Sequence, residues 1–449
     1  MRILALVDGE HYPAVVRTAL GTLPGDVVAA VLLGGREKLP LRQQPDYGDV
    51  PVLTGDDAED ALANGLNAGP VDLVYDLADE PVLDARGRMR LAALTLARGI
   101  PYAGPDFRFE PPPRPRLATK PSVAVVGTGK RTGKTAVAAH IARFLRERGT
   151  PPVLVTMGRG GPPEPELVDP ATFDLSPAGL LALSRSDRHA ASDHFEDALM
   201  AGVVTIGTRR CGGGLAGAPG DDTFAAGVAM ANARPESLLV FEGSGSAVPP
   251  AAADATICVI PADVDRELLG GYLGSYRVLL SDLVVVTMAE TSLAKSGSVS
   301  SLERDVRRLA RGGAAARATA PAIAVIVFRP FPLEPISGRR VFYATTAPAS
   351  AVKALADHLE HDHGAEVIGT SHHLANRPAL AADLEGAEKA EVLVVELKAA
   401  AVDLATRLAL QRGMEVVFCD NRVVPVGGDG PFEELASGTV DRAIERFTP

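Results

Sequence analysis

The feature that most constrains the fold of this chain is the stretch Gly127-Thr-Gly-Lys-Arg-Thr-Gly-Lys-Thr135. An apolar, β-branched run at 121–126 precedes it, and the following residues at 136–148 carry an apolar stripe with a spacing of four. This pattern predicts a strand, a tight turn and an amphipathic helix. Small residues in such a turn let consecutive backbone N–H groups converge on a phosphate, and the helix N-terminus adds partial positive charge. The stretch therefore predicts a loop that binds a nucleoside triphosphate.

The residue types within this loop suggest how it would hold ATP and a metal ion. Lys134 is expected to bridge the β- and γ-phosphates, and the Thr135 hydroxyl is expected to bind Mg²⁺. The common pattern Gly-x4-Gly-Lys-Ser/Thr is not fully met, because Thr128 stands at its first position. Lys130 and Arg131 add cations that either contact a transferring phosphoryl group or form a solvated loop tip. The predicted nucleotide-binding residues are Gly127, Thr128, Gly129, Lys130, Arg131, Thr132, Gly133, Lys134 and Thr135.

Composition narrows the class of protein. A length of 449 residues suggests about three domains. The net charge of −11 argues against non-specific nucleic-acid binding, which depends on a basic surface that neutralises phosphates. No apolar run approaches the roughly 18 residues of a membrane-spanning helix, so we predict a cytoplasmic protein that does not enter a membrane. The three cysteines, Cys211, Cys258 and Cys419, are too widely spaced to indicate a disulfide framework or a zinc site.

Strand and helix patterns alternate along the whole chain, which predicts an α/β fold with parallel sheets and helices on their faces. We expect three such units. They are an N-terminal Rossmann-like domain at 1–110, a central P-loop domain that binds ATP at 119–335, and a C-terminal α/β domain at 336–449. The proline-rich segment at 111–118 is predicted to be a stiff linker between the first two.

Polar residues follow several predicted strands, at the edge where open parallel sheets bind ligands. In the N-terminal unit, residues 8–11 and 76–79 either line a site or serve only as caps and turns. In the central unit, Glu242 follows a buried apolar strand and is the expected second Mg²⁺ ligand. In the C-terminal unit, Lys398 follows the strand at 391–397, and we predict that it completes the active site.

Three arginines are candidates for binding an anionic substrate. Arg159 lies in the glycine-rich segment 158–161 after a predicted strand, where a guanidinium could make a bidentate contact with phosphate. Arg209 and Arg210 precede the glycine run at 212–214 and a predicted helix, an arrangement typical of an anion-binding loop. The predicted catalytic residues are Lys130, Arg131, Lys134, Arg159, Arg209, Arg210 and Lys398.

The loop at 127–135 and the later Glu242-Gly-Ser-Gly245 resemble the dethiobiotin synthetase group of P-loop proteins, but only over the central unit. Over the whole chain, the segments Ala5-Leu-Val-Asp-Gly-Glu-His-Tyr-Pro13, Val31-Leu-Leu-Gly-Gly35 and Glu396-Leu-Lys-Ala-Ala-Ala-Val-Asp403 resemble the cyclic 2,3-diphosphoglycerate synthetase family. This resemblance implies an ATP-dependent ligase that closes 2,3-diphosphoglycerate into a cyclic pyrophosphate through a phosphorylated intermediate, releasing ADP and phosphate. It leaves the oligomeric state open, with a homodimer as one alternative.

Two other functions remain compatible with the sequence. The same pocket could act as a simple kinase that makes 2,3-diphosphoglycerate from 2-phosphoglycerate. The loop could instead belong to a nucleotide-switch protein that acts through partner binding. Switch proteins of that type usually place a signature lysine five residues before the P-loop lysine, where this chain has Gly129.

Overall fold

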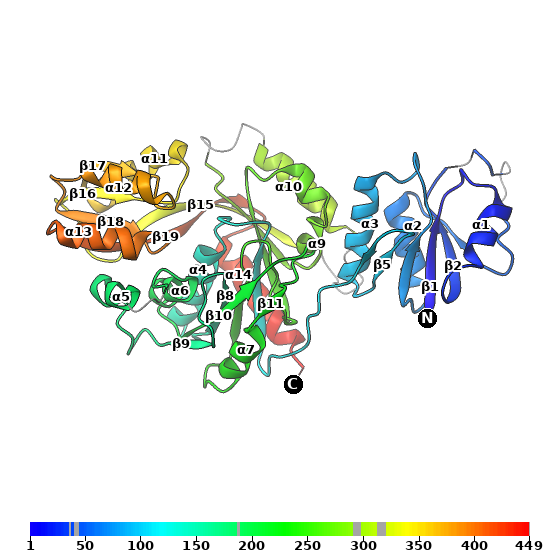
Figure 1. Ribbon diagram of the computed structural model, residues 1–449, viewed down its shortest axis with the longest axis horizontal. Helices are drawn as coiled ribbons and strands as arrows, with labels where there is room; N and C mark the ends of the chain where they lie inside the picture. Colours follow the sequence, from blue (N-terminus) through cyan, green and yellow to red (C-terminus); the bar gives the residue numbers. More distant parts are fainter. Residues whose placement is uncertain (36, 40–44, 186–188, 291–297, 312–319, 449) are drawn as a thin grey trace. The chain divides into compact units, whose positions relative to one another are not determined.

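The computed structural model describes residues 1–35, 37–39, 45–185, 189–290, 298–311 and 320–448. The chain divides into two compact units. The first unit comprises Met1–Pro113, Val264–Leu280 and Arg304–Pro321, and the second comprises Arg114–Asp263, Ser281–Glu303 and Ala322–Pro449. In both units strands alternate with helices (Figure 1), so the predicted α/β fold class is confirmed.

The first unit contains a 6-stranded sheet with the order β3-β2-β1-β4-β5-β6. The strand β1 pairs in parallel with β2 and β4, whereas β6 pairs antiparallel with β5. The strands are β1 (Arg2–Val7), β2 (Asp26–Leu32), β3 (Val52–Leu53), β4 (Leu73–Asp76), β5 (Tyr102–Ala103) and β6 (Arg108–Phe109). All but the first residue of β1 are buried, as expected of a central parallel strand that is covered on both faces.

The helices of the first unit begin at identifiable caps. The side chains of Asp57 and Asp84 accept hydrogen bonds from the backbone N–H groups of Asp60 and Gly87, at the starts of α2 and α3. The helix α9, from the segment between β13 and β14, packs against α3. The helices are α1 (Pro13–Leu20), α2 (Ala58–Asn67), α3 (Ala85–Ala97), α8 (Arg266–Gly270) and α9 (Ser275–Leu279), and α10 (Ser298–Ala310) belongs partly to each unit.

The described strands of the second unit form one 13-stranded sheet with the order β11-β10-β8-β12-β7-β13-β14-β15-β19-β18-β16-β17, and β9 pairs with β10. The P-loop strand β7 lies between β12 and β13, and all three are parallel. The strands are β7 (Ser122–Gly127), β8 (Val153–Gly158), β9 (Glu166–Val168), β10 (Thr205–Cys211), β11 (Asp221–Asp222), β12 (Leu239–Glu242), β13 (Ala255–Pro261), β14 (Leu283–Thr287), β15 (Ala322–Pro332), β16 (Arg340–Ala344), β17 (Glu366–Ser371), β18 (Val392–Glu396) and β19 (Glu415–Gly428). The helices are α4 (Lys134–Glu147), α5 (Pro177–Ser184), α6 (Asp193–Ala201), α7 (Phe224–Asn232), α11 (Ala349–His363), α12 (Arg377–Glu385), α13 (Arg407–Gln411), α14 (Phe432–Arg446) and the π-helix η2 (Ala401–Thr406).

Two long strands, β15 and β19, join the P-loop strands to the strands formed by the last third of the chain (Figure 1). They pair antiparallel, so β16, β17 and β18 run opposite to the P-loop strands. Cys419 of β19 pairs with both Pro332, at the end of β15, and Glu396, at the end of β18. The carboxyl ends of the two sets of parallel strands therefore point toward each other. The sequence did not indicate that these two sets share one sheet, because strand pairing over this distance leaves no local pattern.

The turn between β7 and α4 is held in shape by close packing at its last glycine. Gly133 has a φ of 91° and serves as the N-cap of α4. A Cβ atom at this position would lie 2.5 Å from Cζ of Phe328, in β15. A side chain would therefore meet both backbone strain and a steric clash, which explains the glycine before Lys134.

Candidate active site

A cavity of about 870 Å³ lies in the second unit, between the carboxyl ends of the two opposed sets of strands. One wall comes from the P-loop and from the ends of β8 and β12. The other comes from the ends of β16 and β18, where Thr346 and Lys398 contribute. The predicted site residues that line it are Lys130, Arg131, Thr132, Gly133, Lys134, Thr135, Arg159, Glu242 and Lys398. The structure thus brings together candidates from distant parts of the sequence.

Lys134 is buried at the start of α4. Its Nζ donates hydrogen bonds to the Gly129 carbonyl at 2.8 Å and to Thr132 Oγ1 at 3.4 Å. Burial lowers its pKa to about 8, against the opposing effects of Glu242 and Asp193. A phosphate group would stabilise the charged form, so the geometry suits an ammonium that binds a nucleotide anion.

Thr135 and Glu242 meet at the floor of the cavity. The Thr135 hydroxyl donates a hydrogen bond of 2.7 Å to Glu242 Oε1, and the Glu242 carboxyl also forms a side-chain hydrogen bond with the buried carboxyl of Asp197. Burial, followed by the negative charge of Asp193, raises the pKa of Glu242. A hydroxyl and a carboxylate oxygen are suitable ligands for Mg²⁺. Among the residues that the structure describes, no group of three or more His, Cys, Asp or Glu is arranged to hold a metal.

Three acidic residues on α6 were missed by the sequence analysis. Asp193 and Glu196 line the cavity, and Asp197 is fully buried and accepts a hydrogen bond from Thr156. Burial, followed by the nearby Glu242 carboxylate, raises the pKa of Asp197 well above its ordinary value. Their spacing of three and four residues puts them on one face of a helix that is otherwise largely apolar. Three acids on one face of an otherwise apolar helix were the sequence feature that could have identified these residues.

Lys398 extends from the end of β18 into the cavity and forms an ion pair with Glu196, with 2.9 Å between Nζ and Oε1. Burial lowers the pKa of Lys398, but the Glu196 and Glu396 carboxylates outweigh it and the pKa is raised. The backbone N–H of Lys398 donates to the Glu396 carbonyl, two residues earlier, and Ala399 has a φ of 51°. Such strained turns persist where surrounding structure enforces them, and this one turns the lysine out of the strand.

The predicted arginines occupy different surroundings. Arg159 is exposed and lines the cavity, whereas Arg210 is buried behind the turn after β12 and donates to the Ser244 carbonyl at 2.7 Å. Arg209 is exposed and is not part of the cavity lining. The sequence predicted a helix directly after the glycine run at 212–214, and this prediction was wrong. The strand β10 continues to Cys211, and the next helix, α7, begins only at Phe224. The two adjacent arginines lie within a strand, which turns their side chains to opposite faces.

Comparisons with known proteins identify the family. Models of the N-terminal, P-loop and C-terminal domains of cyclic 2,3-diphosphoglycerate synthetase match residues 2–110, 122–316 and 332–422. Relatives named cyclic 2,3-diphosphoglycerate synthetase match at 44% identity in Rubrobacter xylanophilus (97% of each chain) and 47% in Thermococcus gammatolerans (95% of this chain, 94% of that one). A third, from Methanothermobacter thermautotrophicus, is 41% identical over 99% of this chain and 97% of its own. The chain belongs to the cyclic 2,3-diphosphoglycerate synthetase family.

This membership confirms the predicted resemblance and the prediction of an ATP-dependent ligase acting on a small molecule. It also supports the use of ATP, since the P-loop model of the family covers the loop at 127–135. Gly127, Thr128 and Gly129 belong to this loop, although they do not line the cavity. In the part of the chain that the structure describes, no helix is long and apolar enough to cross a membrane.

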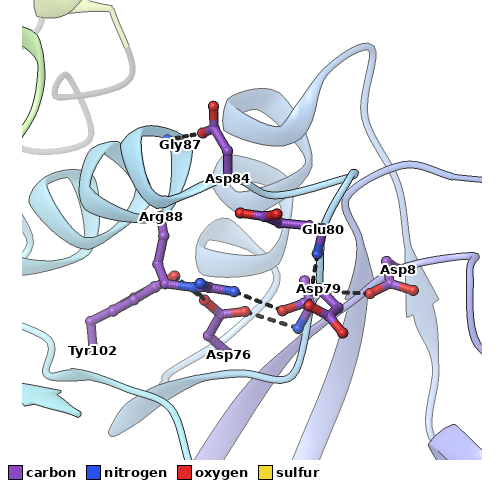
Figure 2. A network of polar contacts seen from close by, with 9 residues as sticks. Asp8, Asp76, Asp79, Glu80, Asp84, Gly87, Arg88 and Tyr102 are labelled. Atoms are coloured by element: carbon purple, nitrogen blue, oxygen red, sulfur yellow. Dashed lines mark hydrogen bonds and ion pairs between the residues drawn. The ribbon is translucent and has the colours of Figure 1, made fainter. Parts of the chain in front are cut away.

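The acidic residues at the strand ends of the N-terminal unit are occupied by internal contacts (Figure 2). Asp8 accepts hydrogen bonds from the backbone N–H groups of Glu10 and Asp79, and its Oδ1 lies 2.8 Å from Nδ1 of His11. Asp76 accepts from Ala78 N, from Arg88 Nε and from the Tyr102 hydroxyl, the last two at 2.7 Å. These contacts favour the alternative in which the acids act as caps and turn formers.

Proposed function

We propose that this chain uses ATP to close 2,3-diphosphoglycerate into its cyclic pyrophosphate and releases ADP and phosphate. The observation that carries the proposal is a single cavity reached from two opposed strand edges. The P-loop lies on one edge, and Lys398 lies on the other. A nucleotide and an anionic acceptor could therefore enter from opposite sides and meet between the two edges.

The residues of the P-loop edge would bind the nucleotide. Lys134 would contact the β- and γ-phosphates in place of its bonds to Gly129 and Thr132. Thr135 and Glu242 would hold Mg²⁺, which when bound would neutralise charge on the phosphates. The exposed Lys130 and Arg131 would approach the transferring phosphoryl group from the rim of the cavity.

The reaction would take place in two displacements. In the first, an oxygen of one acceptor phosphate attacks the γ-phosphorus of ATP, and ADP leaves with the electron pair of the broken bond. In the second, an oxygen of the other acceptor phosphate attacks the phosphorus that was activated, which closes the ring and expels the transferred group as inorganic phosphate. Holding both acceptor phosphates together would supply the effective concentration for ring closure.

The positive charges around the cavity would offset the repulsion between these anions. Lys398 would neutralise the acceptor on its own side, and Arg159 with the buried Arg210 would act from the side of β8 and β12. A substrate phosphate dianion is already a nucleophile, so the proposal assigns no general base.

Incubation of the full chain with ATP, Mg²⁺ and 2,3-diphosphoglycerate, read by phosphorus NMR, tests this proposal. We expect a cyclic product in equal amount to ADP. A parallel incubation with 2-phosphoglycerate that yields linear 2,3-diphosphoglycerate, while 2,3-diphosphoglycerate itself yields no cyclic product, would instead identify the kinase alternative. ATP hydrolysis that no phosphoglycerate stimulates would favour a nucleotide switch.

A further inference from the structure

The turn that follows β12 contains a glycine on which two guanidinium groups converge. Gly245 has a φ of 60° and lines the cavity. A Cβ atom built there would lie 2.9 Å from Nη2 of Arg159 and 3.3 Å from Nη2 of Arg210. The first distance is shorter than real side chains tolerate, so only glycine lets the Arg159 guanidinium lie this close to the turn.

Arg210 holds this turn from behind. It is 8% exposed, and it donates hydrogen bonds to the carbonyls of Gly212 and Ser244, while its Nε has no hydrogen-bond partner in the described part of the chain. Burial, followed by the positive charge of Arg159, lowers its pKa. The turn that carries Gly245 is thus fixed to a buried cation, and a second, exposed cation lies close to the same point.

The charges of these two groups are not neutralised by a direct partner. Among the residues that the structure describes, neither Arg159 nor Arg210 forms a direct ion pair with a carboxylate; the opposing charge that acts most on Arg210 is that of Asp193, in the same cavity. Two guanidinium groups that approach one another repel, and the arrangement is stabilised when an anion of high charge binds beside them. The Arg159 group opens into the same cavity as the P-loop.

We propose that Gly245 determines acceptor specificity, because it seats Arg159 beside Arg210 and so creates a positive site that prefers an acceptor with two phosphate groups over one with a single phosphate. The inference rests on the proposed function, and it adds a positioning residue that touches no reacting atom. Arg159 contacts the ligand, and Arg210 and Gly245 set the place of its guanidinium.

The test is the substitution Gly245→Ala, which adds one methyl group at the point of convergence. We expect the Kd for 2,3-diphosphoglycerate, measured by titration calorimetry on the full chain, to rise about tenfold or more, as for loss of one charge-assisted contact. The Kd values for 2-phosphoglycerate and for ATP should change less than about threefold. Equal losses for all three ligands would overturn the proposal, because the turn would then serve the cavity as a whole.

Gly338→Ala is the matched control. Gly338 has a φ of 71°, and a Cβ atom there would meet no atom within 4 Å. It therefore carries the same backbone penalty without a neighbour to displace, and we expect all three Kd values to stay at the wild-type level. Weakened binding of 2,3-diphosphoglycerate in this control would show that backbone strain alone explains the Gly245 result.

A double-mutant cycle tests whether Gly245 acts through Arg159. Arg159→Met removes the exposed guanidinium and should fold normally, because the side chain makes no ion pair among the described residues. The double variant should bind 2,3-diphosphoglycerate no more weakly than Arg159→Met alone. Additive losses would contradict a positioning role for Gly245.

Inorganic pyrophosphate separates this inference from the proposed reaction, since its binding requires no chemistry. If the wild type bound pyrophosphate and Gly245→Ala did not, while no cyclic product ever formed, the anion site would stand and the proposed reaction would fail. If cyclic product formed and Gly245→Ala bound both phosphoglycerates as the wild type does, the reaction would stand and this inference would fail.

Discussion

The strand ends of the N-terminal unit and those of the P-loop strands look alike in sequence but differ in how their polar groups are satisfied. In the N-terminal unit, both oxygens of Asp8 and of Asp76 accept hydrogen bonds from within the unit. At the P-loop edge, the buried Glu242 carboxyl lies among other acids: burial and the charge of Asp193 raise its pKa, and it shares a side-chain hydrogen bond with Asp197. The charge of buried acids favours a bound cation, so this edge suits a metal ion.

The position of an acid at a strand end therefore does not distinguish an acid that binds a ligand from one that caps a turn. Residues 8–11, 76–79 and Glu242 are all expected at strand ends, and Glu242 is favoured as a ligand only because it lies downstream of the P-loop. What separates them is the set of donors that the fold brings to each carboxylate. Those donors come from distant segments, and so only the structure shows them.

The largest expected effect at the P-loop edge is that of Lys134→Ala. The substitution removes the buried ammonium that would contact the β- and γ-phosphates, so turnover should fall by at least about a hundredfold. Circular dichroism should report an unchanged fold. Activity that remains within about tenfold of the wild type would mean that this edge is not the nucleotide site.

Glu242→Gln should produce the next largest effect, because it weakens the binding of Mg²⁺. The amide keeps the size of the side chain but removes the negative charge beside the Thr135 hydroxyl. We expect the Mg²⁺ concentration for half-maximal activity to rise about tenfold or more. Glu236→Gln, at a neighbouring acid outside the cavity lining, serves as the control. An unchanged Mg²⁺ titration for Glu242→Gln would reduce Glu242 to a strand-end cap like Asp76.

Local patterns predicted the elements around the site well. The strand, turn and helix at 121–148 are present as β7 and α4, and the strand expected at 391–397 is present as β18. Hydrophobic period and turn residues suffice for this, because they act over a few residues. The division into domains at 1–110, 119–335 and 336–449 stays a prediction.

The shared sheet and the acids of α6 could not be predicted in the same way. The pairing of β15 with β19 joins residues about a hundred positions apart in sequence, and only three-dimensional packing determines it. Lys398 was expected near the active site, but its partner Glu196 was not, because the pair forms between a helix and a strand end that no local pattern relates.

Lys398→Ala tests what the edge that carries Lys398 contributes, separately from the P-loop edge. If the lysine neutralises the acceptor during ring closure, the variant should still consume ATP but should lose activated intermediate to water. We expect the ratio of ATP consumed to cyclic product formed to rise about twofold or more over the wild type. A coupled assay measures the ATP, and phosphorus NMR measures the product. Lys353→Ala, at an exposed lysine that pairs with Asp357, provides the control. A normal rate with one product per ATP would remove Lys398 from the chemistry.

The smallest effect on catalysis is expected from Asp76→Asn, which tests the other side of the comparison. The amide cannot accept hydrogen bonds at both positions, so Arg88 and Tyr102 lose a charged acceptor inside the N-terminal unit. The free energy of unfolding should fall by about 1–3 kcal/mol, as expected for a disrupted buried hydrogen-bond network. Because these contacts are structural, kcat/KM per folded molecule should stay within about twofold of the wild type at a temperature below the unfolding transition. A large loss of kcat/KM with an unchanged melting temperature would reverse the assignment, since Asp76 would then serve a ligand rather than the fold.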